Sequence, residues 1–279
     1  MALRRLDSEL VRRGIATSRP QAKELIREGR VSVNGAVATK AATQVLTSAP
    51  IEVSEPHQVR YVSRGAYKLL GALDALGELA PVVEGKRCLD AGASTGGFTD
   101  VLLRKGAASV VAVDVGYGQL AWSLRSDPRV ENLERTNIRY LTPDQVGVAP
   151  DLVVGDLSFI SLELVLPALL RVAPDADMLL MVKPQFEVGK GQVGKSGVVW
   201  DSELRAKAVE KVARSATDLG LRVWAIEPSP LPGPAGNVEY FVAMSAQPDA
   251  AALDDLEAAS RSAVQRGPSA TAQKEVTDG

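Results

Sequence analysis

The sequence predicts a doubly wound α/β sheet preceded by a small α+β domain. Short β-rich runs follow residue 87 and alternate with segments of helical spacing, the pattern of strands joined by crossover helices. A chain of 279 residues is longer than most single domains, so a second, smaller domain is expected. The strand-like runs are CLDAG, SVVAVDV, DLVVGDLSF, MLLMVKP, LRVWAIEP and EYFVAMS.

The composition predicts a cytoplasmic protein that buries a full core. Hydrophobic residues make up 46% and charged residues 24% of the chain. The single cysteine, Cys88, cannot form an internal disulfide, and Arg4 and Arg5 leave no apolar leader after Met1. The most apolar runs fall far short of the roughly 20 residues that span a bilayer, so no membrane partner is expected.

Basic charge is concentrated at the N-terminus. Residues 1–68 hold 12 Lys and Arg against 6 Asp and Glu, whereas the rest of the chain holds 20 against 28. Such an asymmetry is typical of a nucleic-acid-binding segment, although a solvated helix face would explain the charge alone equally well.

The N-terminal segment predicts two short helices and a hairpin. Helical spacing begins at Leu6 and ends at Gly14. Ser18, with a glutamine three residues later, opens a second helix that ends at Gly29. Asn34-Gly35 is a strong two-residue hairpin turn between alternating valines.

These elements, with RLDSELVRRGIATSR and the A-x-x-LI-x-x-GRV-x-VNG run, resemble the αL-type RNA-binding domain of small-subunit ribosomal protein four. Tyrosyl-tRNA synthetases and pseudouridine synthases share this domain. The resemblance implies RNA binding that depends on phosphate contacts from basic side chains. The candidates for RNA contact are Arg4, Arg5, Arg12, Arg13, Arg19, Lys23, Arg27 and Arg30, with Arg64, Lys190 and Lys195 from the rest of the chain.

The domain boundaries follow from these patterns. We expect an RNA-binding domain over 1–59, a connector over 60–63 and the α/β domain over 64–247. Residues 248–279 are rich in Ala, Ser, Asp and Gln and contain no aromatic residue, so a mobile or partly helical tail is expected.

A glycine turn after the first strand predicts a cofactor site. Asp90-Ala-Gly-Ala-Ser-Thr-Gly-Gly-Phe98 lacks the G-x-G-x-x-G spacing of dinucleotide sites and resembles motif I of S-adenosylmethionine methyltransferases. Asp114, about twenty residues on, is placed to bind both ribose hydroxyls. The alternative is a tight turn without a ligand. The cofactor candidates are Asp90, Gly92, Ser94, Gly96, Gly97, Phe98, Asp114, Val115 and Asp156.

A second glycine motif is interpreted differently. Residues 189–196 satisfy G-x-x-x-x-G-K-[ST], but this segment neither leaves a strand directly nor enters a helix, as a phosphate loop would. We therefore expect a flexible glycine/lysine loop over the active site at residues 187–199, and no NTPase activity.

Four charged residues at predicted strand ends and a helix start form a candidate catalytic set. Lys68 lies early in a helix, Asp156 and Lys183 end two strands, and Glu239 begins another. The carboxyl ends of strands in such a sheet converge on the ligand crevice, and Glu239 is expected in a reversed edge strand. The single histidine, His57, lies in the linker region and is a poor candidate for a base. For each of the four residues, the alternative is a surface ion pair.

This quartet, with RGAYKL, CLDAGASTGGFTD, GDLSFISL, MVKPQFE and GNVEYF, closely resembles the TlyA-type members of the FtsJ-like ribose methyltransferases. The resemblance implies a Rossmann-like class I methyltransferase sheet that uses S-adenosylmethionine, without a metal or an obligate protein partner. It implies methylation of cytidine 2′-hydroxyls in 16S and 23S ribosomal RNA, with RNA or ribosomal subunits as partner. Lys183 would be the general base, Lys68 and Glu239 would position the ribose, and Asp156 would hold Lys183 and the amino group of the methyl donor.

One departure and two alternatives accompany this resemblance. Longer members of the family carry R-x-W-V between the domains, and this chain has Arg60-Tyr61-Val62, so a tryptophan-dependent coupling would lack its tryptophan. Family members are also described as haemolysins, which makes a membrane-active protein the first alternative. The second is a non-catalytic ribosome-binding factor that keeps the fold.

Overall fold

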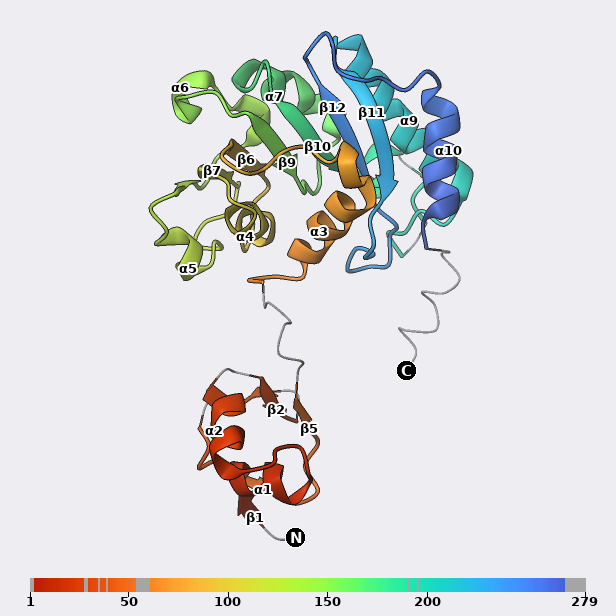
Figure 1. Cartoon of the computed structure of the whole chain (residues 1–279). Helices are drawn as coiled ribbons and strands as arrows, with labels where there is room; N and C mark the ends of the chain where they lie inside the picture. Colours follow the sequence, from red (N-terminus) through yellow and green to blue (C-terminus); the bar gives the residue numbers. More distant parts are fainter. Residues whose placement is uncertain are drawn as a thin grey trace. The chain divides into compact units, whose positions relative to one another are not determined.

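The computed structural model describes residues 3–27, 30–34, 36–38, 40–53, 61–189, 191–194 and 196–268. The chain divides into two compact units, residues 1–60 and residues 61–279, which are described separately below (Figure 1).

The first unit combines two helices with two small antiparallel sheets. Asn34 has the left-handed conformation (φ 52°) that the predicted hairpin turn requires, and Val33 pairs with Ala36 across that turn. The strand orders are β3-β2-β5 and β1-β4. The elements are β1 (Leu3–Arg5), α1 (Leu6–Arg12), α2 (Arg19–Arg27), β2 (Val31–Val33), β3 (Ala36–Val37), β4 (Gln44–Leu46) and β5 (Ile51–Val53).

An apolar cluster holds the described part of this unit together. Leu6 and Leu10 of α1 meet Leu25 and Ile26 of α2, and all four side chains are buried against Val31 of β2. The helical spacing in the sequence therefore marks the faces that form this core.

The second unit is built on a seven-stranded sheet, which confirms the predicted doubly wound α/β fold. Its strand order is β11-β12-β10-β9-β6-β7-β8, with β12 antiparallel to both of its neighbours. The sequence analysis missed β8 because VENL is polar and only partly buried. The strands are β6 (Arg87–Ala91), β7 (Ser109–Val113), β8 (Val130–Leu133), β9 (Leu152–Gly155), β10 (Asp177–Val182), β11 (Arg222–Pro228) and β12 (Tyr240–Ser245).

Helices cover both faces of this sheet. One apolar cluster joins the sheet to α3 and α4, and another joins it to α7, α9 and α10. Among the described residues, none of these helices is both long and apolar enough to cross a membrane. The helices are α3 (Gly65–Leu76), α4 (Gly97–Arg104), α5 (Trp122–Arg125), α6 (Pro143–Val146), α7 (Leu166–Val172), α8 (Pro184–Glu187), α9 (Ser202–Asp218) and α10 (Leu256–Arg266), with 3-10 turns at Gly77–Leu79, Ile138–Tyr140 and Leu162–Leu164.

Glu239 was expected to begin a strand that is both reversed and at the edge of the sheet. The direction is confirmed, and the edge position is wrong. Strand β12, which follows Glu239, is reversed, but it lies between β10 and β11, and β11 forms the edge. Because β12 runs against β10, its amino end lies beside the carboxyl end of β10, where Val182 pairs with Tyr240. This reversal brings Glu239 to the edge of the sheet at which ligands bind in doubly wound folds.

The described part of the connector belongs to the second unit. The Val62 N–H donates to Asp100 Oδ2 of α4 at 2.9 Å. The Tyr61 ring lies 4.7 Å from the Arg104 guanidinium and meets Tyr67 edge to face at 5.6 Å. Tyr61 therefore anchors the start of this unit through its ring, at the position where the family motif has tryptophan.

Of the two states expected for the tail, mobile or partly helical, residues 256–266 adopt the helical one. They form α10, which buries Ala263 and Val264 against the same apolar cluster as α9, and Arg261 pairs with Glu203 of α9 (Figure 1). The residues that α10 buries are small, so the segment lacks the large apolar residues that mark a core helix in a sequence.

We expect that ending the chain at Ala250 destabilises the second unit, because it exposes the apolar surface that α10 covers. The loss should be about 2 to 4 kcal/mol, which corresponds to a fall in Tm of roughly 5 to 15 °C. Differential scanning calorimetry measures it. As a control, Arg261→Ala removes only exposed ion pairs and should leave Tm almost unchanged. An unchanged Tm in the shortened chain would restore the mobile-tail interpretation.

Candidate active site

The glycine turn after β6 forms the floor of the site. Gly92 has φ 86°, and a Cβ there would lie 2.8 Å from the backbone oxygen of Asp156, so only glycine fits. Gly96 also has a positive φ, 97°, and neither Gly96 nor Gly97 leaves room for a Cβ. A Cβ on Gly96 would meet Leu124, and one on Gly97 would meet the Ser63 hydroxyl.

Asp90 is buried and only half satisfied. Its Oδ2 accepts the Thr99 N–H at 2.9 Å and the Thr99 hydroxyl at 2.7 Å, while Oδ1 has no hydrogen-bond partner among the described residues. Burial raises the pKa of Asp90 to about 7, with the Thr99 hydrogen bonds opposing that shift. A carboxylate with an unused oxygen fits a cationic ligand such as the amino group of S-adenosylmethionine.

Asp114 lies at the end of β7 with its carboxylate held in place. Its Oδ2 accepts the Ser94 N–H at 2.8 Å, and its Oδ1 accepts the Gly116 N–H at 2.7 Å. It lines a cavity of about 480 Å³ together with Ser94 and Val115. Each oxygen keeps a lone pair, so the predicted contact with two ribose hydroxyls is chemically possible.

Phe98 differs from the other cofactor candidates. Its ring stacks on Phe241 of β12 at 6.1 Å and is 3% exposed. It borders a second cavity, of about 310 Å³, rather than the one that contains Asp114. Its position is mainly that of a core residue.

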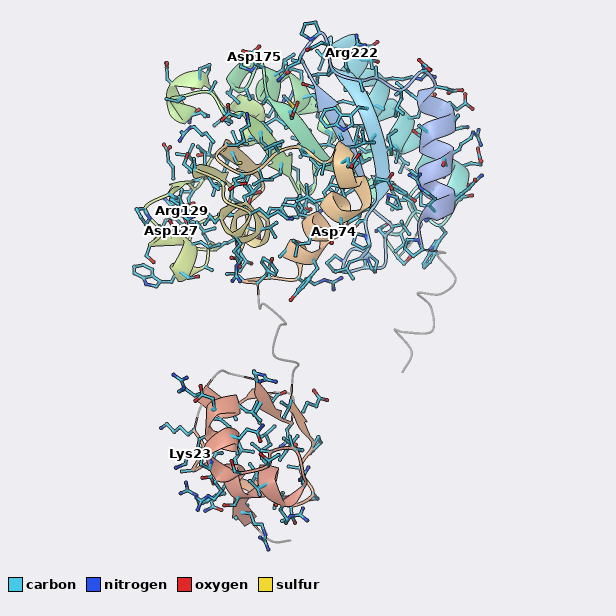
Figure 2. The ribbon with its side chains drawn as sticks, in the orientation of Figure 1. Lys23, Asp74, Asp127, Arg129, Asp175 and Arg222 are labelled. Atoms are coloured by element: carbon cyan, nitrogen blue, oxygen red, sulfur yellow. The ribbon has the colours of Figure 1, made fainter. Side chains whose placement is uncertain are left out.

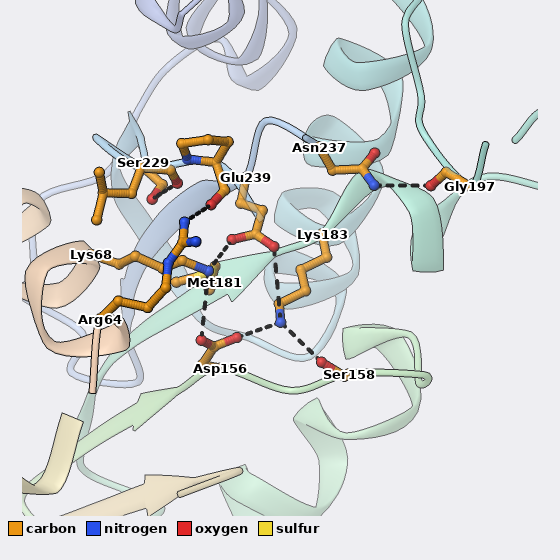
Figure 3. Close-up of polar contacts among 12 residues, drawn as sticks. Arg64, Lys68, Asp156, Ser158, Met181, Lys183, Gly197, Ser229, Asn237 and Glu239 are labelled. Atoms are coloured by element: carbon orange, nitrogen blue, oxygen red, sulfur yellow. Dashed lines mark hydrogen bonds and ion pairs between the residues drawn. The ribbon is translucent and has the colours of Figure 1, made fainter. Parts of the chain in front are cut away.

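The four candidate catalytic residues come together at one edge of the sheet (Figure 3). Lys68 is on α3, Asp156 follows β9, Lys183 follows β10, and Glu239 precedes β12. Lys68, Lys183 and Glu239 are at most 8% exposed. Because burial is unfavourable for an isolated charge, these groups depend on one another.

Their charges alternate around a closed ring. The Lys68 ammonium lies 2.5 Å from Glu239 Oε2 and 3.9 Å from Asp156 Oδ2. The Lys183 ammonium lies 2.5 Å from Asp156 Oδ1 and 3.9 Å from Glu239 Oε1. Each lysine thus has one close and one more distant carboxylate, and the ring as a whole is neutral (Figure 3). We call these four residues the charge ring.

The cavity beside the charge ring shares a wall with the larger cavity that contains Asp114. The 310 Å³ cavity is lined by Lys68, Lys183 and Asp156 of the ring. Gly92, Ser94, Asp156 and Ser158 line both this cavity and the larger one. A methyl group bound between the cavities could therefore face a hydroxyl held by the ring.

The basic residues of the first unit divide into two groups. Four of the RNA-contact candidates bind buried carboxylates: Asp7 pairs with Arg5 and Arg19, and Glu9 pairs with Arg12 and Arg13. The paired arginines hold the pKa of the Asp7 carboxyl well below its usual range and lower that of Glu9 to about 2. Two arginines on each carboxylate leave one net positive charge at each cluster.

The other candidates are placed differently. Arg4 and Lys23 are exposed, and Lys23 points away from its unit (Figure 2). Arg27 pairs with Glu24, and Arg30 is partly buried. In the second unit, Arg64 donates to the Pro232 carbonyl at 2.8 Å. Lys190, Lys195 and His57 lie outside the described residues.

The 189–196 segment lacks the context of a phosphate loop. Helix α9 begins only at Ser202, where Asp201 caps it, so the segment does not run into a helix. The Asn237 amide bonds to the end of the loop instead, donating to the Gly197 carbonyl at 2.9 Å and accepting the Val199 N–H at 3.0 Å (Figure 3).

Several residues of the site were not singled out from the sequence. Thr99 fixes Asp90, Ser158 accepts a hydrogen bond from Lys183, and Glu187 and Asn237 hold neighbouring loops. All four lie inside or beside quoted motifs, such as GDLSF and MVKPQFE. The motifs themselves were recognised in the sequence. An uncharged serine or asparagine within such a motif, however, gives no sign in the sequence that it contacts the site.

Comparison with known protein families gives a match for each of the two units. The model of the FtsJ-like methyltransferases matches residues 61–246, and that of the S4 domain matches residues 4–51. The chain is 58% identical over 266 residues to the 16S/23S rRNA (cytidine-2′-O)-methyltransferase TlyA of Mycobacterium tuberculosis, covering 95% of this chain and 98% of that protein.

Two further relatives bear a different name. Hemolysin A of Brachyspira hyodysenteriae is 37% identical over 239 residues, which cover 85% of this chain and 98% of that one. A solved structure from Streptococcus thermophilus, also named as a hemolysin, is 35% identical with a TM-score of 0.72, covering 100% of this chain and 99% of that one.

Asp90→Asn should change both stability and cofactor binding. The folded-state pKa of about 7 lies above the ordinary 3.8, so the folded chain holds a proton that the unfolded chain has lost between these values. This residue's contribution to stability therefore falls as pH rises from about 4 to 7 and stays low above that. At pH 8 the cofactor-free variant should be more stable than the unmodified protein by about 1 to 4 kcal/mol.

Thermal unfolding at pH 5 and pH 8 measures the first effect, and calorimetric titration with S-adenosylmethionine measures the second. The variant should bind the cofactor more weakly, because it has no negative charge for the amino group. If both proteins show the same pH dependence of Tm, Asp90 does not carry the raised pKa.

Asp114→Ala should raise the cofactor Kd by roughly tenfold or more, because a charged hydrogen-bond pair is worth about 1.5 to 3 kcal/mol. Fluorescence or calorimetric titration measures the constant. S-adenosylhomocysteine keeps the ribose, so its affinity should fall by a similar factor. An unchanged Kd for both ligands would show that Asp114 does not bind the ribose.

Proposed function

The chain belongs to the FtsJ-like methyltransferase family and carries an S4 domain, and on that premise we propose that it methylates cytidine 2′-hydroxyls in ribosomal RNA. The proposed substrates are 16S and 23S RNA, the two named for the relative at 58% identity. S-adenosylmethionine is the methyl donor, as the family implies.

The charge ring is the observation that carries this proposal. It places two lysines and two carboxylates around a cavity of about 310 Å³ that shares a wall with the cavity of Asp114. A ribose hydroxyl is a weak acid, so transfer to it needs a proton acceptor and a fixed approach to the methyl group. The ring offers groups for both tasks.

We assign the roles as follows. S-adenosylmethionine, when bound, supplies a methyl group on a sulfonium, which is a good leaving group. Lys183, in its neutral form, accepts the 2′-hydroxyl proton at Nζ. Asp156 holds Lys183 at 2.5 Å and faces both cavities, so it also reaches the amino group of the donor. Lys68 and Glu239 hold each other at 2.5 Å and position the ribose.

The residues that follow β9 indicate whether the methyl group goes to the ribose or to the base. Enzymes that methylate a flipped base usually carry an N/D-P-P-Y/F type motif there to hold the base. In this chain, Gly155-Asp156-Leu-Ser-Phe159 lacks the proline pair and directs a carboxylate to Lys183. This chemistry favours ribose over base.

The S4 domain supplies RNA affinity in this proposal. Arg4 and Lys23 are exposed, and the two arginine–carboxylate clusters each keep a net positive charge. Contacts of this kind bind phosphates without reading bases, so sequence selection must come from the shape of the RNA and from the active site.

Two alternative functions, a non-catalytic ribosome-binding factor and a haemolysin, are less well supported, for different reasons. A non-catalytic factor is incompatible with membership of an enzyme family at 58% identity to a methyltransferase. The haemolysin interpretation is carried by the names of relatives alone, and no contact among the described residues favours it. We do not propose it.

Lys183→Ala should abolish methyl transfer and leave cofactor affinity within about twofold, because Lys183 is assigned to proton removal. Tritium transfer from labelled S-adenosylmethionine to ribosomal RNA measures the rate, and calorimetric titration measures the affinity. The assignment is wrong if the variant turns over at the unmodified rate.

Arg4→Ala combined with Lys23→Ala should weaken RNA binding and reduce the slope of log Kd against log salt by about 1 to 2, since each lost phosphate contact removes just under one counterion. Filter binding at several salt concentrations measures the slope. Cofactor affinity serves as the control and should not change. An unaltered slope would exclude both residues from the RNA interface.

A further inference from the structure

The Lys183 amine donates a hydrogen bond to a residue outside the charge ring. Its Nζ lies 2.5 Å from Asp156 Oδ1 and 3.0 Å from the hydroxyl oxygen of Ser158 (Figure 3). Glu239 Oε1 is 3.9 Å away, beyond hydrogen-bond length. Two side chains therefore contact this nitrogen directly, Asp156 through an ion pair and Ser158 through a hydrogen bond.

We propose that Ser158 is a positioning residue for methyl transfer: its hydroxyl oxygen accepts one N–H of Lys183 and so aims the nitrogen lone pair at the ribose 2′-hydroxyl. This inference rests on the proposed function, in which Lys183 is the proton acceptor.

The geometry of an amine explains why a second acceptor matters. Neutral Lys183 has two N–H groups and one lone pair, arranged tetrahedrally with the bond to Cε. The ion pair with Asp156 alone would leave the amine free to rotate, and the lone pair would have no fixed direction. With Asp156 on one side and Ser158 accepting an N–H on the other, the lone pair points away from both oxygens.

The step balances with the groups named. A lone pair of the 2′-oxygen forms the bond to the methyl carbon, and the carbon–sulfur bond breaks with its electron pair left on sulfur. The 2′-hydroxyl proton moves to Lys183 Nζ, where it takes the place of the lone pair. The resulting ammonium keeps its ion pair with Asp156 and its hydrogen bond to Ser158.

The position of Ser158 agrees with this role. It is one of the residues that line both cavities, so its hydroxyl lies where donor and acceptor would meet. The other serine in the shared wall, Ser94, donates to Gln119 at 3.3 Å and has no contact with the charge ring among the described residues.

The loop that carries Ser158 is fixed to the segment that carries Lys183. Helix α8 begins directly after Lys183, and its Glu187 accepts the Ser161 hydroxyl at 2.6 Å and the Leu162 N–H at 2.8 Å. The Phe186 ring meets that of Phe159 at 5.2 Å. Glu187 is 5% exposed, so these contacts are shielded from water and hold the loop against α8.

The backbone of the loop is also under constraint. Phe159 has φ 64°, a conformation that non-glycine residues rarely adopt, although its side chain is 90% exposed. Strain of this kind persists where the surroundings impose it. Here it turns the chain immediately after Ser158, which keeps the serine hydroxyl directed at Lys183.

The test compares four side chains at position 158 in the full-length enzyme, with ribosomal RNA and S-adenosylmethionine both saturating. Ser158→Ala should lower the single-turnover rate by about 10- to 100-fold, the loss expected for a hydrogen bond to a charged or ionising group. RNA KM and cofactor Kd should stay within about twofold. Ser158→Thr should recover most of the rate, and Ser158→Cys should fall between Ala and Thr.

This order follows acceptor strength, whereas a role in packing alone would follow size and favour Cys and Ala over the larger Thr. Ser202→Ala, which removes an exposed hydroxyl at the start of α9, serves as the matched control and should keep the full rate. An unchanged rate in Ser158→Ala, or a rate order that follows size, overturns the inference.

The outcome for Lys183→Ala separates this inference from the proposed function. If that variant is inactive while Ser158→Ala is fully active, the proton acceptor stands and only the role of Ser158 is wrong. If Lys183→Ala keeps the unmodified rate, the proposed mechanism is wrong, and the inference about Ser158 falls with it.

Discussion

The charge ring is the constraint on which the arrangement of the second unit depends. Four ionisable side chains lie at one edge of the sheet, and three of them are almost fully buried. Buried charges are tolerated when they are paired, and each lysine here lies between two carboxylates. Helix α3 and three strand ends must therefore stay in register. The reversal of β12 is part of the same constraint, because a parallel strand would begin at the opposite edge and carry Glu239 away.

The charge ring and Asp90 are buried charges of two kinds. The charged groups of the ring are paired with one another, so the ring can hold its shape without a ligand. Asp90 satisfies one oxygen through Thr99 and leaves the other without a partner among the described residues, at a cost that burial imposes. A cationic ligand would remove that cost. The first group thus suits a preorganised catalytic site, and the second suits a site completed by binding.

The sequence predicted the elements of this architecture better than their partnerships. Glycine spacing, apolar runs, the three charged strand ends and Lys68 near a helix start were visible in the chain, since each follows from a local pattern. The pairing of Arg5, Arg12, Arg13 and Arg19 with buried Asp7 and Glu9 was not, because counting charges does not tell which of them meet. Strand β8 was missed because VENL is polar, and the packing of helix α10 on the domain was missed because its buried face is made of small residues. Ser158 was passed over because a serine beside a catalytic aspartate looks like any loop serine until its distance to Lys183 is known.

The central claim is that this site transfers a methyl group to the ribose and leaves the base unmodified. It is tested most directly by methylating ribosomal RNA with the purified enzyme and isotope-labelled S-adenosylmethionine, digesting the product to nucleosides and fragmenting them in a mass spectrometer. The account predicts labelled cytidine whose fragment ion is unlabelled cytosine, because the label stays with the lost ribose. A cytosine fragment that carries the label would contradict it, even if every cofactor contact described above were correct.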